Sequence, residues 1–113
     1  MSEITRSPGI YKGRNKAVSA TGFVWSVGTG EGGTVAEQTR NTLATIEANL
    51  KQAGSDKTRI VEATVYLTDM DTKQEMDDVW CDWIGEHGPC RACVGTELAH
   101  GHRVEIKVLA LKG

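Results

Sequence analysis

The sequence contains no long apolar segment and no marked excess of charge of either sign. No stretch approaches the roughly 18 consecutive apolar residues of a membrane-spanning helix, and residues 1–6 lack the apolar core of a secretory signal. The net charge is −2 and the basic residues are scattered, which argues against a nucleic-acid-binding surface. We therefore expect a cytoplasmic protein with neither a membrane nor a nucleic acid as partner.

Cysteine is also scarce. Three cysteines are an odd number for a disulfide framework, and reduced thiols are typical of the cytosol. Cys90 and Cys93 form a C-x2-C pair, but His100 and His102 follow at a spacing unlike that of zinc motifs. If this segment is a strand, the two cysteines also point to opposite faces. We expect no metal site.

The length of 113 residues predicts a single domain, residues 1–113, with a modest core. It contains no linker, repeat or low-complexity tract. Residues 17–20 and 23–27 form a predicted hairpin. The glycine-rich segment 28–33 lacks the spacing of phosphate-binding loops, so we interpret it as a flexible connection to the next helix.

Two capping-box patterns predict two helices. Thr34 to Glu37 opens the first helix, which extends to about Gln52 with an apolar stripe at spacings of three and four residues. Thr72 to Glu75 opens the second, which ends at Gly85. The apolar stripes consist of Leu43, Ile46 and Leu50 in the first helix, and Met76, Val79, Trp80, Trp83 and Ile84 in the second.

Three further strands are predicted, over about 60–67, 91–96 and 103–111. In the first of these, alternation places Val61 on one face with Ala63, and Ile60 on the other. The order β-β-α-β-α-β-β predicts an α+β fold, with both helices on one face of a single mixed sheet. The other face would be half-apolar and open, so we expect a homo-oligomer that covers it.

Arg91 and Glu105 each place a charge inside an otherwise apolar strand. A buried charge without a partner is strongly destabilising. One interpretation is a structural ion pair between the two strands. The other is a carboxylate-binding arginine beside a general acid and base, and the pattern alone favours the structural pair.

Four segments resemble the RidA/YjgF/YER057c/UK114 (L-PSP) family, in the right order and spacing. They are Glu37-Gln-Thr-Arg-Asn-Thr-Leu43, Ala63-Thr-Val-Tyr-Leu-Thr-Asp-Met70, Gly88-Pro-Cys-Arg-Ala-Cys-Val94 and Val104-Glu-Ile106. The match runs from about Lys16 to Ala110 and is most like the YoaB-like branch. The resemblance implies a chorismate-mutase-like fold of the bacillus type, assembled as a homotrimer with active sites in the clefts between subunits.

The resemblance also implies an activity, the hydrolysis of reactive enamines and imines such as 2-aminoacrylate to 2-oxo acids and ammonia. Arg91 matches the family arginine that grips the substrate carboxylate, and Glu105 matches the acid associated with the attacking water. Cys93 matches a cysteine whose backbone lines the pocket, and Gly28 a glycine that closes a strand. A guanidinium binds a carboxylate bidentately and a carboxylate can activate water, so the reaction requires no cofactor and no metal.

The sequence departs from the family pattern at two pocket positions. Arg14 replaces a tyrosine, and Val27 replaces the serine that usually precedes Gly28. A cation at position 14 suggests a substrate with a second carboxylate, and the alternative is that Arg14 is a solvated strand-end residue. A non-catalytic trimer that binds a small 2-oxo or amino acid is the alternative function. The acidic pI weighs against the ribonuclease activity attached to the L-PSP name.

Overall fold

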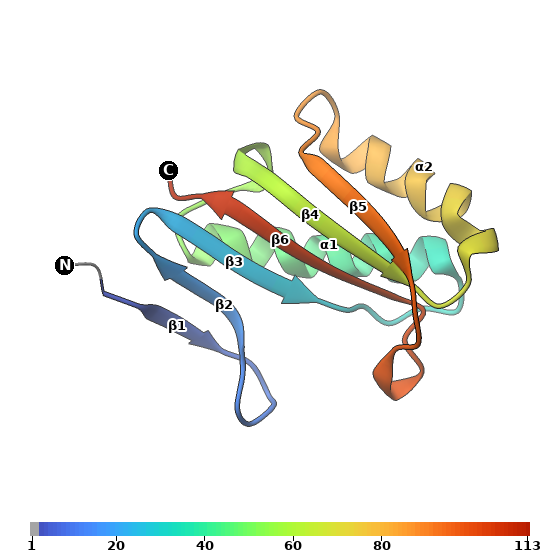
Figure 1. Cartoon of the computed structure of the whole chain (residues 1–113), viewed down its shortest axis with the longest axis horizontal. Coiled ribbons are helices and arrows are strands. Elements are labelled where there is room, and N and C mark those ends of the chain that lie inside the picture. The colour runs from blue at the N-terminus through green and yellow to red at the C-terminus, as the bar shows by residue number, and fades with distance from the viewer. Residues whose placement is uncertain (1–2) are drawn as a thin grey trace.

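The computed structural model describes residues 3–113 and contains six strands and two long helices (Figure 1). The elements are β1 (Thr5–Pro8), β2 (Asn15–Ala20), β3 (Phe23–Gly28), α1 (Val35–Gln52), β4 (Ile60–Leu67), α2 (Lys73–Ile84), β5 (Cys90–Gly95) and β6 (Val104–Leu111). Short 3-10 turns, η1 (Lys57–Arg59), η2 (Met70–Thr72) and η3 (Ala99–Gly101), occupy parts of the connections.

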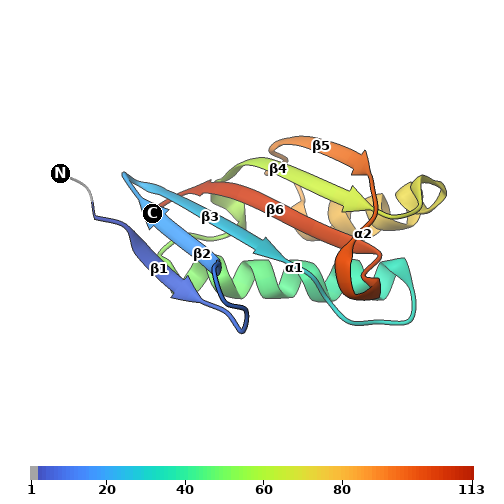
Figure 2. The same cartoon turned by 60° about the horizontal axis from the view of Figure 1, so that its bottom comes forward.

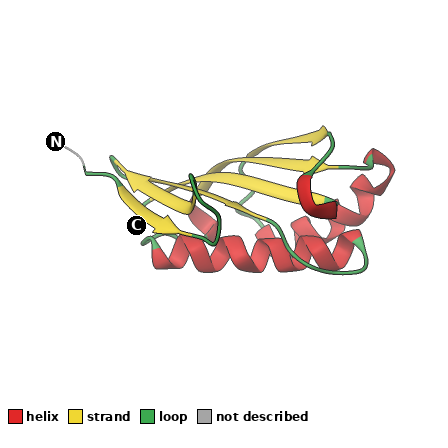
Figure 3. Ribbon diagram, turned by 90° about the horizontal axis from the view of Figure 1, so that it is seen from below, coloured by secondary structure: helices red, strands yellow, loops and turns green. Residues whose placement is uncertain are grey.

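The strands form one mixed sheet in the order β1-β2-β3-β6-β4-β5. Every pair is antiparallel except β4 and β5, which are parallel and joined by α2. Both helices cover the same face of the sheet (Figure 3), and α1 runs lengthwise beneath its middle (Figure 2). The predicted α+β fold is therefore confirmed.

Strand β1 is the one strand of the described residues that the sequence pattern did not predict. Its residues are exposed or only partly buried, so it has no alternation of apolar and polar side chains. It is held as an edge strand by pairing with β2, in which Arg6 lies opposite Val18.

The core lies between the sheet and the two helices. The predicted stripe of α1 is fully buried, and Met76, Trp80 and Ile84 of α2 are buried with it. These side chains pack against the inward residues of β4 and β6, including Val65 and Ile106. No helix among residues 3–113 is long and apolar enough to cross a membrane.

Strand β4 begins with a bulge that the alternation pattern did not reveal. Ile60 lies opposite Ala110 and Glu62 opposite Leu109, so Val61 is the extra residue. Ile60 is consequently buried with Ala63, whereas Val61 is 41% exposed. The predicted assignment of Ile60 and Val61 to the two faces was wrong for this reason.

The first predicted helix cap is confirmed and the second is wrong. Thr34 Oγ1 accepts a hydrogen bond from the Glu37 backbone N–H at 3.1 Å. Thr72, in contrast, makes no cap, and its hydroxyl donates to the Asp69 carbonyl at 2.6 Å. Glu75 instead accepts from the Ala36 backbone N–H at 2.8 Å, which ties the first turns of the two helices together.

The glycine-rich segment is packed against α1 instead of forming the flexible connection expected. A Cβ on Gly30 would lie 2.5 Å from the Thr42 backbone nitrogen and 2.8 Å from the Gln38 carbonyl oxygen, so only glycine fits there. The Asn41 side chain donates to the Glu31 carbonyl at 2.7 Å, and Gln38 donates to Gly32 at 3.0 Å. The end of β3 is therefore fixed relative to the helix.

Candidate active site

Arg91 lies on β5, at one edge of the sheet, and its guanidinium is held by α2. Nη2 donates to Asp77 Oδ1 at 2.6 Å, and Nη1 lies 3.7 Å from Met76 Sδ. The guanidinium carbon is 5.2 Å from the centre of the Trp80 ring. The side chain is 17% exposed, so the charge is paired and still within reach of solvent.

Glu105 does not pair with Arg91. Val104 and Ile106 are buried under the helices, so Glu105 between them faces the other side of the sheet. It lies opposite Tyr66 of β4. The structural ion pair between Arg91 and Glu105 that the pattern favoured is therefore wrong, since the acidic partner of Arg91 is Asp77.

The remaining strand residues of the predicted site fall on two sides of the sheet. Cys93 and Gly28 lie in the same row of paired residues across the sheet. Gly28 pairs with Ile106, Ile106 with Val65, and Val65 with Cys93. Three strand spacings separate the backbones of Cys93 and Gly28, about 14 Å. Val27 lies opposite Lys107, on the open face with Glu105. A single chain thus does not bring Arg91 and Cys93 together with Glu105 and Val27.

Cys93 is a partly buried free thiol on the face of β5 that meets the helices. It packs partly against the core, and burial raises the pKa of its thiol, although the nearby charges of Arg91 and Lys73 act against this. A raised pKa disfavours the thiolate that a nucleophile requires. Cys90, on the opposite face, is exposed. Among residues 3–113 no group of three or more metal-ligating side chains comes together.

Arg14 lies in the loop between β1 and β2, stacked on an aromatic side chain. Its guanidinium carbon is 4.4 Å from the centre of the Tyr11 ring. Tyr11 in turn stacks on His100, with ring centroids 5.6 Å apart. The stack joins this loop to η3, so the Arg14 side chain is exposed but lies against an aromatic ring.

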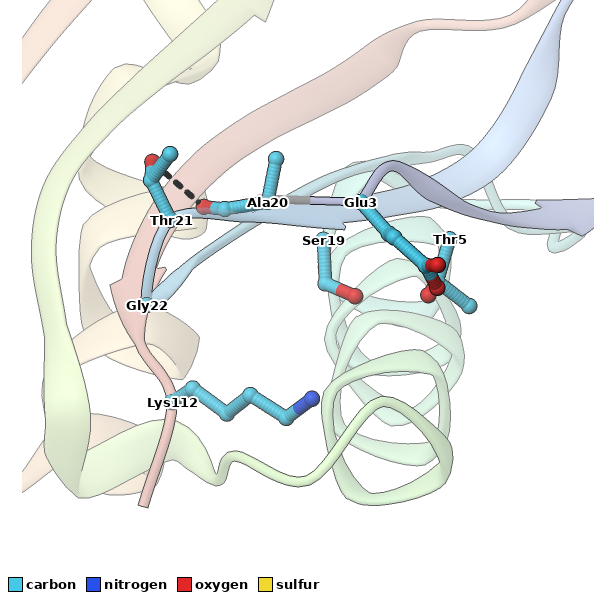
Figure 4. A pocket seen from close by; sticks show the side chains of 7 residues that line it. All are labelled: Glu3, Thr5, Ser19, Ala20, Thr21, Gly22 and Lys112. Atoms are coloured by element: carbon cyan, nitrogen blue, oxygen red, sulfur yellow. Dashed lines mark hydrogen bonds between the residues drawn. The ribbon is translucent and has the colours of Figure 1, made fainter. Parts of the chain in front are cut away.

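Two hollows on the described surface contain none of the predicted site residues. A cavity of about 430 Å³ lies by the β2–β3 turn and the end of the last strand (Figure 4), lined by Glu3, Thr5, Ser19, Ala20, Thr21, Gly22 and Lys112. A groove of about 550 Å³ runs between the helices, past Arg40, Lys57 and Trp83. Neither of these hollows encloses the Arg91 guanidinium.

The Asp77 carboxylate gives the folded state a specific pH dependence. Burial would raise the pKa of Asp77, but hydrogen bonds from Lys73 and Arg91 outweigh it and hold the pKa below its ordinary value. The folded carboxyl therefore binds its proton less readily than the unfolded one. Its contribution to stability is complete above the ordinary pKa and is lost as the pH falls through the lower, folded value.

We expect the free energy of unfolding to decline below about pH 4 and to decline less steeply in Asp77→Asn. Glu47 and Asp56, whose pKa values are also lowered, contribute to the slope that remains in this variant. Urea unfolding between neutral and acidic pH measures this. Asp78→Asn, which alters an exposed neighbour bonded to Gln74, is the matched control. An unchanged acid slope in Asp77→Asn would contradict the assignment.

The chain matches known proteins over nearly its whole length. The family model described as Endoribonuclease L-PSP matches residues 7–112. The RutC family protein YoaB of Escherichia coli K12 is 41% identical over 76 residues, which cover 66% of this chain and 67% of YoaB. A RutC family protein of Pyrococcus horikoshii is 32% identical over 108 residues, covering 87% of this chain and 86% of the relative.

The fold agrees with these matches. The crystal structure of a YjgF-family protein of Neisseria meningitidis has a TM-score of 0.92 to this chain at 40% identity, covering 98% of this chain and 96% of the other. The fold and the matches define the class, small α+β proteins of the YjgF type. The chain belongs to the RidA/YjgF/L-PSP family, as the sequence motifs predicted.

Proposed function

We propose that the protein is an enamine and imine deaminase that hydrolyses 2-imino acids to 2-oxo acids and ammonia. The proposal rests on one observation, which is that the Arg91 guanidinium keeps a donor without a partner in the described part of the chain. Both of its polar contacts use Nη atoms, and within residues 3–113 its Nε–H makes no hydrogen bond. The Nε–H, together with the second N–H of Nη2, can therefore bind a carboxylate. Family membership supports the same assignment.

Arg91 holds the substrate carboxylate and thereby places the C=N bond. Glu105 accepts a proton from water as the water oxygen bonds to the carbon of the protonated imine, giving a carbinolamine. Glu105 then gives this proton to the nitrogen, and as the C–N bond breaks it takes the hydroxyl proton, so that ammonia leaves and the 2-oxo acid forms. Glu105 finally releases that proton to solvent. Because an imine is already reactive, placement contributes most of the acceleration. Gly28, Val27 and Cys93 line the pocket in this proposal.

We infer that a homotrimer completes the site in the clefts between its subunits. The separation of Arg91 from Glu105 by the sheet, and of Cys93 from Gly28 by about 14 Å, supports a site that needs a second chain. The open face and its rim also expose apolar side chains, including Phe23, Val61 and Leu111. The partner is a small imino or enamino acid in the cytoplasm, and the net charge of −2 does not favour RNA.

A coupled assay tests the proposal. An amino-acid oxidase generates the imine, semicarbazide traps it, and the semicarbazone is measured by absorbance. We expect the wild-type protein to suppress the signal, and Glu105→Gln to lower kcat about 100-fold with KM nearly unchanged. Glu62→Gln, an exposed carboxylate of β4, is the control. Binding of a 2-oxo acid without any loss of imine would instead identify a non-catalytic binding protein.

Arg14 is proposed to select a substrate with a second carboxylate. We expect the wild type to prefer iminoglutarate over iminoalanine, and Arg14→Ala to reduce this preference about 10-fold, since one charge-assisted contact is lost. The ratio of kcat/KM values for the two substrates measures the effect. Lys12→Ala, an exposed cation of the same loop, should leave the ratio unchanged. An unchanged ratio in Arg14→Ala would exclude this role.

A further inference from the structure

Asp77 bonds to two cations, Arg91 and Lys73, on the side of β5 that faces the helices. Its Oδ1 accepts from Arg91 Nη2 at 2.6 Å and its Oδ2 accepts from Lys73 Nζ at 2.6 Å. We propose that Asp77 is a positioning residue that fixes the Arg91 guanidinium in the orientation that binds the substrate carboxylate. This inference rests on the proposed function of Arg91.

The contacts of Arg91 determine the orientation of its guanidinium. Asp77 and Met76 hold the Nη end, and the Trp80 ring lies against the guanidinium carbon. All three residues belong to α2, on the side of the helix that faces the sheet. Because one N–H of Nη2 is used by Asp77, Nε–H and the second N–H of Nη2 form the edge left for a ligand. A planar guanidinium binds a carboxylate well only when such an edge is presented correctly.

Fixing the guanidinium in advance also strengthens binding. An unrestrained arginine loses rotamer entropy when it closes on a ligand, and this cost is reduced when the side chain is already ordered. The side chains of Arg91 and Asp77 are only 17% and 19% exposed, so neither is free to explore solvent. The substrate carboxylate therefore meets a guanidinium that is already in place.

The net charge of Lys73, Asp77 and Arg91 also suits the binding of a substrate carboxylate. Lys73 and Arg91 contribute two positive charges and Asp77 one negative charge, which leaves one positive charge for one substrate carboxylate. Without Lys73, the Asp77–Arg91 pair would be neutral and would attract an anion weakly. Lys73 thus allows Asp77 to hold Arg91 without cancelling the charge that the substrate needs.

Asp78 provides the matched control. It follows Asp77 directly, but it is bonded at 2.8 Å to the Gln74 side chain on the exposed surface of α2. Asp78→Ala removes the same side chain from the same helix turn without touching Arg91. A general effect of losing a carboxylate from α2 would appear in both variants, whereas the positioning effect is confined to Asp77.

The experiment compares Asp77→Ala, Asp77→Asn and Asp78→Ala in the coupled imine assay. We expect Asp77→Ala to raise KM about 10-fold with kcat within about twofold of wild type. Asp77→Asn retains an oxygen that accepts from Nη2 and should recover most of the loss. Asp78→Ala should match the wild type. In an Arg91→Ala background, Asp77→Ala should have no further effect on kcat/KM.

A second measurement reports on Arg91 without relying on catalysis. The ¹H–¹⁵N resonance of the Arg91 Nε–H, assigned by its loss in Arg91→Lys, should be sharp in the wild type and Asp77→Asn and broadened in Asp77→Ala. An unchanged resonance and an unchanged KM in Asp77→Ala would overturn the proposal. Equal losses of affinity in Asp77→Ala and Asp77→Asn would also overturn it. If the wild type hydrolyses no imine, the proposed function fails, and the resonance still decides whether Asp77 fixes Arg91.

Discussion

Arg91→Ala is expected to lower kcat/KM for imine hydrolysis about 1,000-fold, on the order of 4 kcal/mol of transition-state stabilisation. Alanine removes the only group proposed to bind the substrate carboxylate, so the imine carbon is no longer held near Glu105 and its water. The semicarbazide assay, run over a range of substrate concentrations, measures the loss. Arg91→Lys retains the charge but not the bidentate edge, and we expect it to recover only a small part of the activity.

Folding controls accompany this variant. Removing Arg91 leaves Asp77 paired with Lys73, so we expect the free energy of unfolding to fall by only about 1–2 kcal/mol. Arg40→Ala, which removes an exposed arginine of α1, should retain full activity. Near wild-type activity in a folded Arg91→Ala protein would contradict the role proposed for Arg91 and, with it, the proposed mechanism.

Gly30→Ala is expected to reduce the free energy of unfolding by about 3 kcal/mol. The added methyl group would approach the backbone of α1 at Thr42 and Gln38 within 2.8 Å or less, and a helix backbone inside the fold cannot move aside without disturbing its own hydrogen bonds. The Gly30 segment also carries the bonds from Asn41 and Gln38, so shifting it would weaken them. Urea unfolding monitored by tryptophan fluorescence measures the change.

Gly33→Ala is the matched control, because nothing lies within 4 Å of a Cβ at that position. We expect its stability to change by less than about 1 kcal/mol. Similar stabilities for the two variants would show that the approach of Gly30 to α1 is readily relieved, and that the segment is more compliant than its contacts indicate.

Local patterns predicted the helices and most of the strands, because each of these elements buries one face and its apolar residues therefore recur at a regular spacing. In α1, for example, Leu43, Ile46 and Leu50 recur every three to four residues because they all face the sheet. The bulge at Val61 was not predictable, since it depends on the pairing of β4 with β6. Thr72 failed as a cap for a similar reason, because Glu75 bonds to the other helix.

The candidate site was predictable in its residues but less so in its contacts. Arg91 was noticeable as a charge in an apolar strand, and the requirement for an anionic partner was correct. The choice of partner depends on how α2 lies against β5, which places Asp77 and not Glu105 beside it. Arg14 could be singled out only by comparison with the family pattern. Its contact with Tyr11, which itself stacks on His100, joins two loops far apart in the sequence.

The position of β6 has a consequence for synthesis. Among residues 3–113 it is the strand that comes last, yet it lies between β3 and β4 and alone links the two halves of the sheet. A nascent chain that has released everything up to β5 therefore has two incomplete half-sheets with open inner edges. Folding of the whole sheet waits until residues 104–111 leave the ribosome, and during that interval the chain depends most on protection from aggregation.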